Sequence, residues 1–370
     1  MSRCILFVVD AMILGGGPVV CYNLIRSLNS THFNPCVIAL FSKGPLGERL
    51  ESEGVPLLCL NLRRPFRLTQ IRKFLPEIVS FARAHNVCLV HAHLMASGLY
   101  GGLAARTLGV PAVFTAHGEL SRRFPLCLVE VGIRHLSGTL VGVSRCGEAE
   151  IRRYSLFRKG RRFLHIYNGI DTLYWTRDAY TADRFPKDEK RICITMVANF
   201  FREKDHRTAI ESFRLFSAKY ANSLLTLAGE GEERTRVEGW AREMGLQNVV
   251  FAGEVEDIKA LLARTDIFIL SSLSEGFGIA VVEAMAMELP VVASDVGGMR
   301  EIITHEVDGV LVPPKDPGAL FKALDKLVRQ PMLRESIGKK ARERVVSTFS
   351  LDTMTNAYLS LYRELMEPRR

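Results

Sequence analysis

The alternation of short apolar runs with helical segments constrains the fold of this chain more than any other feature. The alternation continues along the whole sequence, and it is typical of parallel sheets with helices packed on their faces. We therefore expect two doubly wound α/β domains in series. Strands are expected near 3–9, 35–41, 56–60, 87–91, 111–115, 138–143 and 162–166, then near 192–198, 223–228, 248–252, 266–271, 290–294 and 309–312.

The length of 370 residues exceeds one ordinary domain. The stretch 176–191 is polar and lacks a strong period, so it is interpreted as a linker. We predict a first domain over 1–180, a second over 181–350 and a closing helix over 351–370. Helices are expected at 18–29, 69–85 and 95–108, the last one stopping at Gly109.

The positive charge is concentrated in the first half. Residues 1–185 contain 23 Lys+Arg and 12 Asp+Glu, a net charge of +11, and the remainder contains 26 and 28, a net charge of −2. This asymmetry favours an anionic partner such as a membrane surface, a nucleic acid or an acidic substrate. The alternative is a solvated basic face.

Two further features indicate a cytosolic protein without a membrane span. No apolar run approaches the roughly 18 residues that would cross a bilayer, and Asp10 interrupts the N-terminal run, which favours a buried strand over a signal peptide. Seven of the eight cysteines lie in the first half without a C-x-x-C pair, so they are expected to be reduced core residues.

Ligands of open α/β sheets bind outside the carboxyl ends of the strands, and distinctive residues follow the strands of the first half. Gly15-Gly16-Gly17 follows the first strand and either approaches a phosphate or forms a plain tight turn. His91 and His93 follow the fourth strand and His117 the fifth. We expect His91 and His93 on opposite faces, which would exclude a shared metal ion, and a histidine that hydrogen-bonds a substrate hydroxyl or phosphate. Asn168-Gly169 predicts a tight turn with positive φ.

Charged and glycine-rich turns follow the strands of the second half. Lys204 and Arg202 can neutralise a diphosphate, or they are exposed loop charges. Gly297-Gly298 could present N–H groups to a phosphate or a sugar. No Asp-x-Asp pair occurs in the sequence, so charge neutralisation would depend on these cations and on helix termini.

The stretch from Ser271 to Glu301 is the most informative about function. It contains Glu275 in a glycine-rich turn and Glu283 inside a helix otherwise made of Ala, Val and Met. A carboxylate on so apolar a helix is costly unless a polar partner meets it. Glu283 therefore either reaches solvent or binds hydroxyl donors such as those of a ribose.

Three motifs appear in order: E-G-F-G-x-x-x-x-E at 275–283, P-V-V-A-S-x-x-G-G at 290–298 and D-G-x-L-V-P-P at 308–314. On these motifs the chain resembles a retaining glycosyltransferase of the group 1, or family 4, type. The resemblance implies the α/β GT-B fold, in which two Rossmann-like doubly wound domains face a central cleft and a C-terminal helix crosses back to the first domain. The first domain would bind the acceptor, and the second would bind the nucleotide sugar.

The resemblance also implies the activity. It is the metal-independent transfer, without a cofactor, of a hexose-type sugar from a nucleotide-diphosphate sugar to an acceptor hydroxyl. The acceptor would be a glycan or a lipid-linked glycan in cell-surface polysaccharide, lipopolysaccharide or glycolipid synthesis. Front-face attack, with the leaving diphosphate taking the acceptor's proton, is the expected route to retention, because the sequence offers no convincing carboxylate nucleophile near His117. Glu119 is the nearest candidate.

Residue roles carry over by position. His117, Lys204 and Glu275 match the catalytic positions. Asn199 stands where the family often has an arginine, so either Arg202 substitutes for that arginine or the phosphates are held less tightly. The donor-binding residues implied by the match are Gly16, Asn199, Arg202, Lys204, Glu275, Gly276, Phe277, Gly278 and Glu283.

The basic first half then indicates a location and a partner. Basic residues interleaved with apolar ones suit an anionic membrane or a lipid-linked acceptor, so we expect a cytoplasmic protein in peripheral contact with the inner face of the membrane. The residues concerned are Arg63, Arg64, Phe66, Arg67, Arg72, Lys73, Phe74 and the segment 122–128. A sugar-nucleotide epimerase and a nucleic-acid-binding protein are the rival hypotheses, and no recognition motif supports the second.

Overall fold

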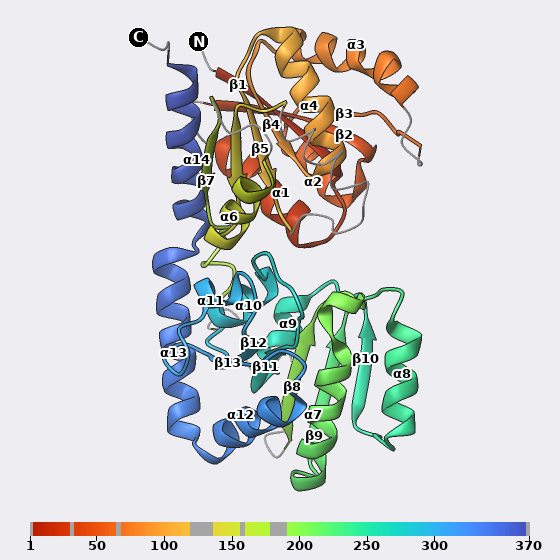
Figure 1. Cartoon of the computed structure of the whole chain (residues 1–370), viewed down its shortest axis with the longest axis vertical. Coiled ribbons are helices and arrows are strands. Elements are labelled where there is room, and N and C mark those ends of the chain that lie inside the picture. Colours follow the sequence, from red (N-terminus) through yellow and green to blue (C-terminus); the bar gives the residue numbers. More distant parts are fainter. Residues whose placement is uncertain are drawn as a thin grey trace. The chain divides into compact units, whose positions relative to one another are not determined.

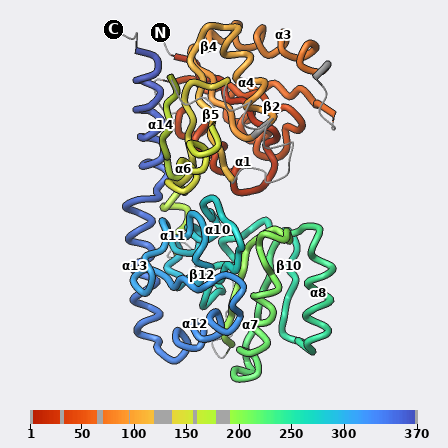
Figure 2. The backbone as a smooth tube through the Cα atoms, in the orientation of Figure 1, coloured from red at the N-terminus to blue at the C-terminus, as the bar shows by residue number. Residues whose placement is uncertain are grey.

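The computed structural model describes residues 3–29, 33–63, 68–118, 136–155, 160–177 and 191–367. The chain divides into two compact units (Figure 1). The first comprises Met1–Gly169 together with Leu351–Arg370, and the second comprises Ile170–Ser350. The expected domain limit at residue 180 falls within 178–190, outside the described residues. The C-terminal segment belongs to the first unit, and in Figure 2 its blue helix lies beside the red and yellow elements of that unit.

The first unit contains a seven-stranded parallel sheet of order β3-β2-β1-β4-β5-β6-β7. Its strands are β1 (Arg3–Ala11), β2 (Phe33–Ser42), β3 (Leu57–Cys59), β4 (Val87–His93), β5 (Ala112–Ala116), β6 (Thr139–Gly142) and β7 (Arg162–His165). Its helices are α1 (Gly16–Asn29), α2 (Gly44–Ser52), α3 (Leu68–Ala84), α4 (Met95–Leu108), α6 (Arg145–Tyr154) and α14 (Leu351–Met366).

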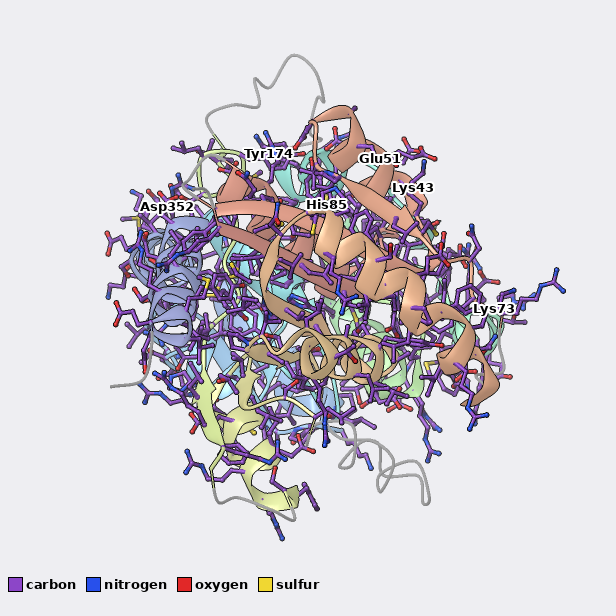
Figure 3. All side chains as sticks on the ribbon, turned by 90° about the horizontal axis from the view of Figure 1, so that it is seen from above. Lys43, Glu51, Lys73, His85, Tyr174 and Asp352 are labelled. Carbon is purple, nitrogen blue, oxygen red and sulfur yellow. The ribbon has the colours of Figure 1, made fainter. Side chains whose placement is uncertain are left out.

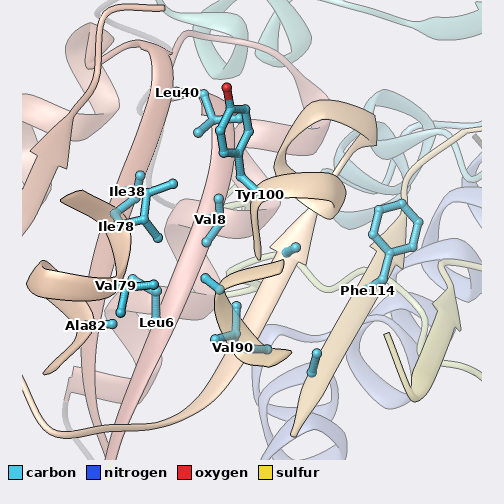
Figure 4. Packing of buried hydrophobic residues seen from close by; sticks show 14 of the residues in the cluster. Leu6, Val8, Ile38, Leu40, Ile78, Val79, Ala82, Val90, Tyr100 and Phe114 are labelled. Atoms are coloured by element: carbon cyan, nitrogen blue, oxygen red, sulfur yellow. The ribbon is translucent and has the colours of Figure 1, made fainter. Parts of the chain in front are cut away.

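Strand alternation divides the buried side chains of this sheet between two helical layers. Leu6, Val8 and Val90 point to the face covered by α3 and α4, where they meet Ile78 and Tyr100 (Figure 4). Helices α1 and α14 contact each other and cover the opposite face. Burial on both faces explains why the strands read as continuous apolar runs.

The two ends of α4 are capped in different ways. Gly109 ends the helix in the left-handed region, with φ of 70°, as the sequence predicted. Leu94 before the helix has no side-chain acceptor, and Asp10 at the end of β1 accepts a hydrogen bond from the Ser97 N–H at 2.9 Å instead. A side chain from a neighbouring strand therefore caps this helix.

The second unit contains a six-stranded parallel sheet of order β10-β9-β8-β11-β12-β13. Its strands are β8 (Ile192–Val197), β9 (Ser223–Ala228), β10 (Val249–Gly253), β11 (Ile267–Leu270), β12 (Val291–Ser294) and β13 (Val310–Val312). Its helices are η2 (Arg202–Lys204), α7 (His206–Lys219), α8 (Arg234–Glu243), α9 (Ile258–Ala263), α10 (Ile279–Ala286), α11 (Met299–Ile302), α12 (Pro317–Arg329) and α13 (Pro331–Thr348).

Both sheets are doubly wound, as the sequence predicted, and each reverses its strand order at one point. The reversal lies between β1 and β4 in the first unit and between β8 and β11 in the second. Such switch points open a crevice at the carboxyl ends of the strands, where ligands bind. None of the described helices combines the length and apolarity needed to cross a bilayer.

Candidate active site

The switch point of the second unit brings the loops after β8 and β11 together. The Ser271 hydroxyl, at the end of β11, donates to the Asp205 carbonyl at 2.9 Å and lies 3.3 Å from that of Lys204. The Leu273 N–H donates to the Glu203 carbonyl at 2.7 Å. These bonds fix η2 against the start of the glycine-rich turn, and so they fix Lys204.

Lys204 and Glu275 form an ion pair at this junction. The Lys204 Nζ lies 2.5 Å from Glu275 Oε2, and the Ser272 hydroxyl lies 3.3 Å from the same oxygen. The Lys204 side chain is 25% exposed and the Glu275 side chain is 12% exposed. A cation so held, yet still accessible to a ligand, can neutralise developing phosphate charge.

Arg202 and Asn199 lie in the same loop, and both are exposed. Within the described part of the chain Arg202 makes no ion pair, so its guanidinium is available to an anion. The neighbouring backbone is tightly fixed, because the Phe200 N–H donates to the Glu230 carbonyl at 2.9 Å.

The turn that carries Glu275 packs directly on the Gly297-Gly298 turn. The Gly298 N–H donates to the Glu275 carbonyl at 2.9 Å, and a Cβ on Gly298 would lie 2.5 Å from the Gly276 carbonyl oxygen. The paired glycines are thus required by the close approach of two backbones. Gly297-Gly298 was considered as a turn that could present N–H groups to a ligand, and the N–H of Gly298 is already used in this contact between the two turns.

Phe277 and Gly278 have different places in this turn. The Phe277 ring is buried, with 2% exposure, and its edge packs on Phe349 with ring centroids 5.6 Å apart. A donor could therefore meet only the backbone of Phe277. Gly278 adopts φ of 94° directly before α10, a conformation that favours glycine.

Glu283 lies on α10, whose other residues are Ile, Ala, Val and Met. The side chain retains partial exposure, and it makes no hydrogen bond or ion pair with any other described residue. Burial raises the pKa of this carboxyl to about 8. A desolvated acid without a partner favours the ligand hypothesis over the hypothesis of a solvent-directed side chain.

The switch point of the first unit brings the glycine run and the histidines together. Gly16 begins α1, and a Cβ on Gly17 would lie 3.5 Å from His117 Cγ. His93 Nδ1 and His117 Nε2 are 2.8 Å apart. His91 is bonded to Thr115 Oγ1 at 2.7 Å and to the Tyr362 hydroxyl at 2.6 Å.

The expectation that His91 and His93 lie on opposite faces was wrong. Residues i and i+2 of a strand share a face, and the two imidazole centroids are 4.1 Å apart. The alternation of side chains along the strand therefore gives no reason to exclude a metal ion shared by His91 and His93. Among the described residues there is no group of three or more His, Cys, Asp or Glu side chains that could hold a metal ion.

Asn168-Gly169 also differs from its prediction, since neither residue has positive φ. The segment instead extends into a bridge, in which the Ile170 N–H donates to the Phe349 carbonyl at 3.0 Å. Asp171 accepts from the Leu173 and Tyr174 N–H groups, both at 3.0 Å. Glu119 and the segment 122–128 lie outside the described residues.

Solved structures define the fold class. A glycosyltransferase from Rickettsia africae matches with a TM-score of 0.85 and 20% identity over 100% of both chains. HepE from Anabaena, solved in complex with UDP-glucose, matches with a TM-score of 0.83 and 19% identity over 98% of this chain and 99% of that one. The fold is GT-B, as predicted.

Sequence comparisons identify the family. The model of the glycosyl transferases group 1 matches residues 181–344, and that of glycosyltransferase family 4 matches residues 14–173. An uncharacterised glycosyltransferase of Methanocaldococcus jannaschii is 36% identical over about half of each chain, 55% of this one and 54% of the relative. The UDP-Gal:α-D-GlcNAc-diphosphoundecaprenol α-1,3-galactosyltransferase of Escherichia coli is 25% identical over 87% of each chain. The chain belongs to the group 1 glycosyltransferases and is a glycosyltransferase enzyme.

Proposed function

We propose that the protein transfers a hexose-type sugar, with retention, from a nucleotide-diphosphate sugar to a hydroxyl of a glycan or lipid-linked glycan. The product would enter cell-surface polysaccharide or glycolipid synthesis. The observation that carries this proposal is the accessible Lys204–Glu275 pair at the switch point of the second sheet, in the same unit as the unpartnered carboxyl of Glu283.

In this proposal the second unit binds the donor. Glu283 accepts hydrogen bonds from ribose hydroxyls, which supply the polar partners that its apolar surroundings lack. Lys204 and Arg202 meet the diphosphate, with Asn199 in the same loop. Glu275 meets the transferred sugar. The backbone of Gly276, Phe277 and Gly278, at the start of α10, lies beside the phosphates.

The first unit would bind the acceptor and contribute His117 and Gly16 to the reaction centre. Ile13 and Leu14 follow β1 and Leu94 follows β4, and they retain 49%, 47% and 36% of their exposure. These apolar side chains lie at the carboxyl ends of adjacent strands, which suits an acceptor with an apolar portion. The name of the E. coli relative specifies such a lipid-linked acceptor.

For the chemistry we propose front-face attack. The acceptor oxygen forms the new bond to the anomeric carbon while the bond from that carbon to the phosphate oxygen breaks. The acceptor's proton passes to the leaving phosphate oxygen, so atoms and charge balance without a carboxylate nucleophile. Lys204 and Arg202 would stabilise the diphosphate charge in place of a metal ion.

We further propose that the enzyme works at the inner face of the cytoplasmic membrane. Arg63, Arg72 and Lys73 are exposed, and Lys73 extends outward from α3 in Figure 3. Phe74 instead packs against the core of the first unit, so the described part of this region offers charge rather than an apolar anchor. Co-sedimentation with anionic liposomes at low salt tests this point, and its absence would contradict it.

The donor-site assignment is tested by changing Lys204 to Ala. Loss of a cation from the diphosphate should lower kcat by about 100-fold or more, whereas the exposed Lys340→Ala control should match the wild type. Near-normal turnover of the Lys204 variant would refute the assignment. Thermal-shift screening with UDP-, GDP- and ADP-sugars identifies the donor, and formation of a new sugar nucleotide without acceptor would indicate an epimerase instead.

A further inference from the structure

Helix α13 packs beside the two short helices that adjoin the glutamate-bearing turn, and Figure 1 shows α10 and α11 next to it. Ala341 and Val345 are fully buried and lie one turn apart on the same face of α13. Arg342 and Arg344 lie at the two margins of that face, because successive residues of a helix are rotated by about 100°. Their side chains therefore extend to different neighbours.

Arg342 binds the carboxyl end of α10. Its Nη1 donates to the Ala286 carbonyl, the last of the helix, at 2.5 Å, and to the Trp175 carbonyl at 2.9 Å. Ala286 is fully buried, so its carbonyl would be costly without a donor. A cation at this end of a helix is also favoured by the helix dipole. Arg342 therefore fixes the end of α10.

The position of Glu283 depends on this contact. Glu283 precedes Ala286 by three residues in a helix of eight, so the two residues lie on the same side of α10. No hydrogen bond or ion pair with another described residue holds the Glu283 carboxyl. Its place is therefore set by the backbone of α10, and the end of that backbone is held by Arg342.

Arg344 binds the carboxyl end of α11 in the same manner. Its Nε and Nη2 donate to the carbonyls of Ile302 and Glu301, both at 2.6 Å. Helix α11 has four residues and follows Gly298, whose N–H donates to the Glu275 carbonyl at 2.9 Å. Through this short path Arg344 supports the turn that carries Glu275.

The carbonyls are the closer partners of both guanidinium groups. Arg342 Nε lies 3.8 Å from Glu288 Oε1, and Arg344 Nε lies 3.7 Å from Asp308 Oδ2. Each of these distances exceeds the hydrogen bonds to the helix ends by about 1 Å. The arginines therefore hold the helix ends first and form ion pairs second.

We infer that Arg342 and Arg344 are positioning residues of the donor site with separate effects. Arg342 acts through α10 on Glu283 and so on the ribose of the donor. Arg344 acts through α11 on Glu275 and so on the transferred sugar. The inference rests on the proposed function for the roles of the two glutamates. The two backbone paths are properties of the free protein.

Amide hydrogen exchange of the full chain tests the two paths without a ligand. Arg344→Met should speed exchange of the Gly298 N–H about tenfold and leave the Met287 N–H, at the end of α10, within about twofold. Arg342→Met should do the reverse, and Lys340→Met, exposed on the same helix, should change neither. Equal acceleration at both amides would indicate general loosening and would overturn the separate paths. Lys at either arginine position keeps a charged donor and should give the same pattern at smaller size if a Met variant does not fold.

Nucleotide affinity tests the action of Arg342 through Glu283. The probe is UDP, GDP or ADP, whichever thermal shift selects. Arg342→Met should raise its Kd about fivefold, within the range for one lost ribose hydrogen bond. In the Glu283→Ala background the same change should raise the Kd less than twofold, because the contact that it displaces is already absent. A fivefold loss in both backgrounds would overturn the role of Arg342.

Turnover tests the action of Arg344. Arg344→Met should lower kcat at saturating donor about tenfold, because a small displacement of a group at the reacting centre slows the reaction. Arg342→Met should keep kcat within about threefold of the wild type. Equal losses of kcat in the two variants would overturn the separate roles. If the wild type binds none of the three nucleotides, the proposed function fails, whereas the exchange rates still decide the two backbone paths.

Discussion

Changing Glu283 to Gln should stabilise the free enzyme as the pH rises. The folded state holds the proton of Glu283 more tightly than the unfolded state, because burial raises the pKa from its ordinary 4.5 to about 8. The resulting stability is fully present below pH 4.5 and is lost as the pH rises through 8. Each pH unit in this window lowers the free energy of unfolding by about 1.4 kcal/mol, or about 3 kcal/mol in total by pH 7.

Partial exposure of Glu283 lets solvent screen the ionised form, which reduces the expected difference at pH 7 to about 1–2 kcal/mol. Gln does not titrate, so Glu283→Gln should match the wild type at pH 4.5 and exceed its stability increasingly toward pH 8. Urea unfolding at several pH values measures the difference, with the exposed Glu256→Gln as the control. A difference independent of pH, or a less stable variant at pH 8, would refute this account of Glu283.

The same substitution should weaken donor binding. Gln replaces one carboxyl oxygen of Glu283 by an amide group, and the loss of one ribose hydrogen bond costs about 0.5–1.5 kcal/mol, a rise of about two- to twelvefold in the Kd for the sugar nucleotide. Isothermal titration with the donor identified by thermal shift measures this change. Stabilisation without weaker binding would remove Glu283 from the donor site.

Two further substitutions test packing. Gly298→Ala places a methyl group on the Gly276 carbonyl and should lower the free energy of unfolding by about 2 kcal/mol or more while weakening donor binding. Gly239→Ala, in open space within α8, is the control and should raise it by about 0.5–1 kcal/mol. Urea midpoints compare the two variants, and unchanged stability of Gly298→Ala would contradict the close-approach account. Tyr362→Phe leaves His91 Nδ1 without its partner and should cost about 1–3 kcal/mol, seen as faster hydrogen exchange in β4; unchanged exchange would contradict this role of α14.

Sequence periodicity predicted the two sheets well, because strands buried on both faces are apolar throughout. It placed the end of the fourth strand at His91, whereas β4 continues to His93, which pairs with Thr115 of β5. A rule based on apolar runs stops at a polar side chain. Here the imidazoles are buried and neutral, so the strand continues through them.

The site was predictable in its motifs but not in its contacts. Lys204 and Glu275 were recognised separately, and their ion pair depends on the loops after β8 and β11 meeting at a switch point. Phe277 is a turn residue in the sequence, yet its ring packs on Phe349, which is distant in the chain. Asp10 showed no signal beyond interrupting an apolar run, because a cap supplied by another element leaves no local pattern.

The backbone contact between Gly276 and Gly298 has a consequence for building chimeric enzymes. An exchange of donor preference between relatives would fail if only the glutamate-bearing turn were grafted into a recipient without glycine at the position of Gly298. The Cβ atom of the residue at that position would clash with the grafted Gly276 carbonyl. The smallest transplantable module is therefore the continuous stretch 271–301, which carries both halves of that contact.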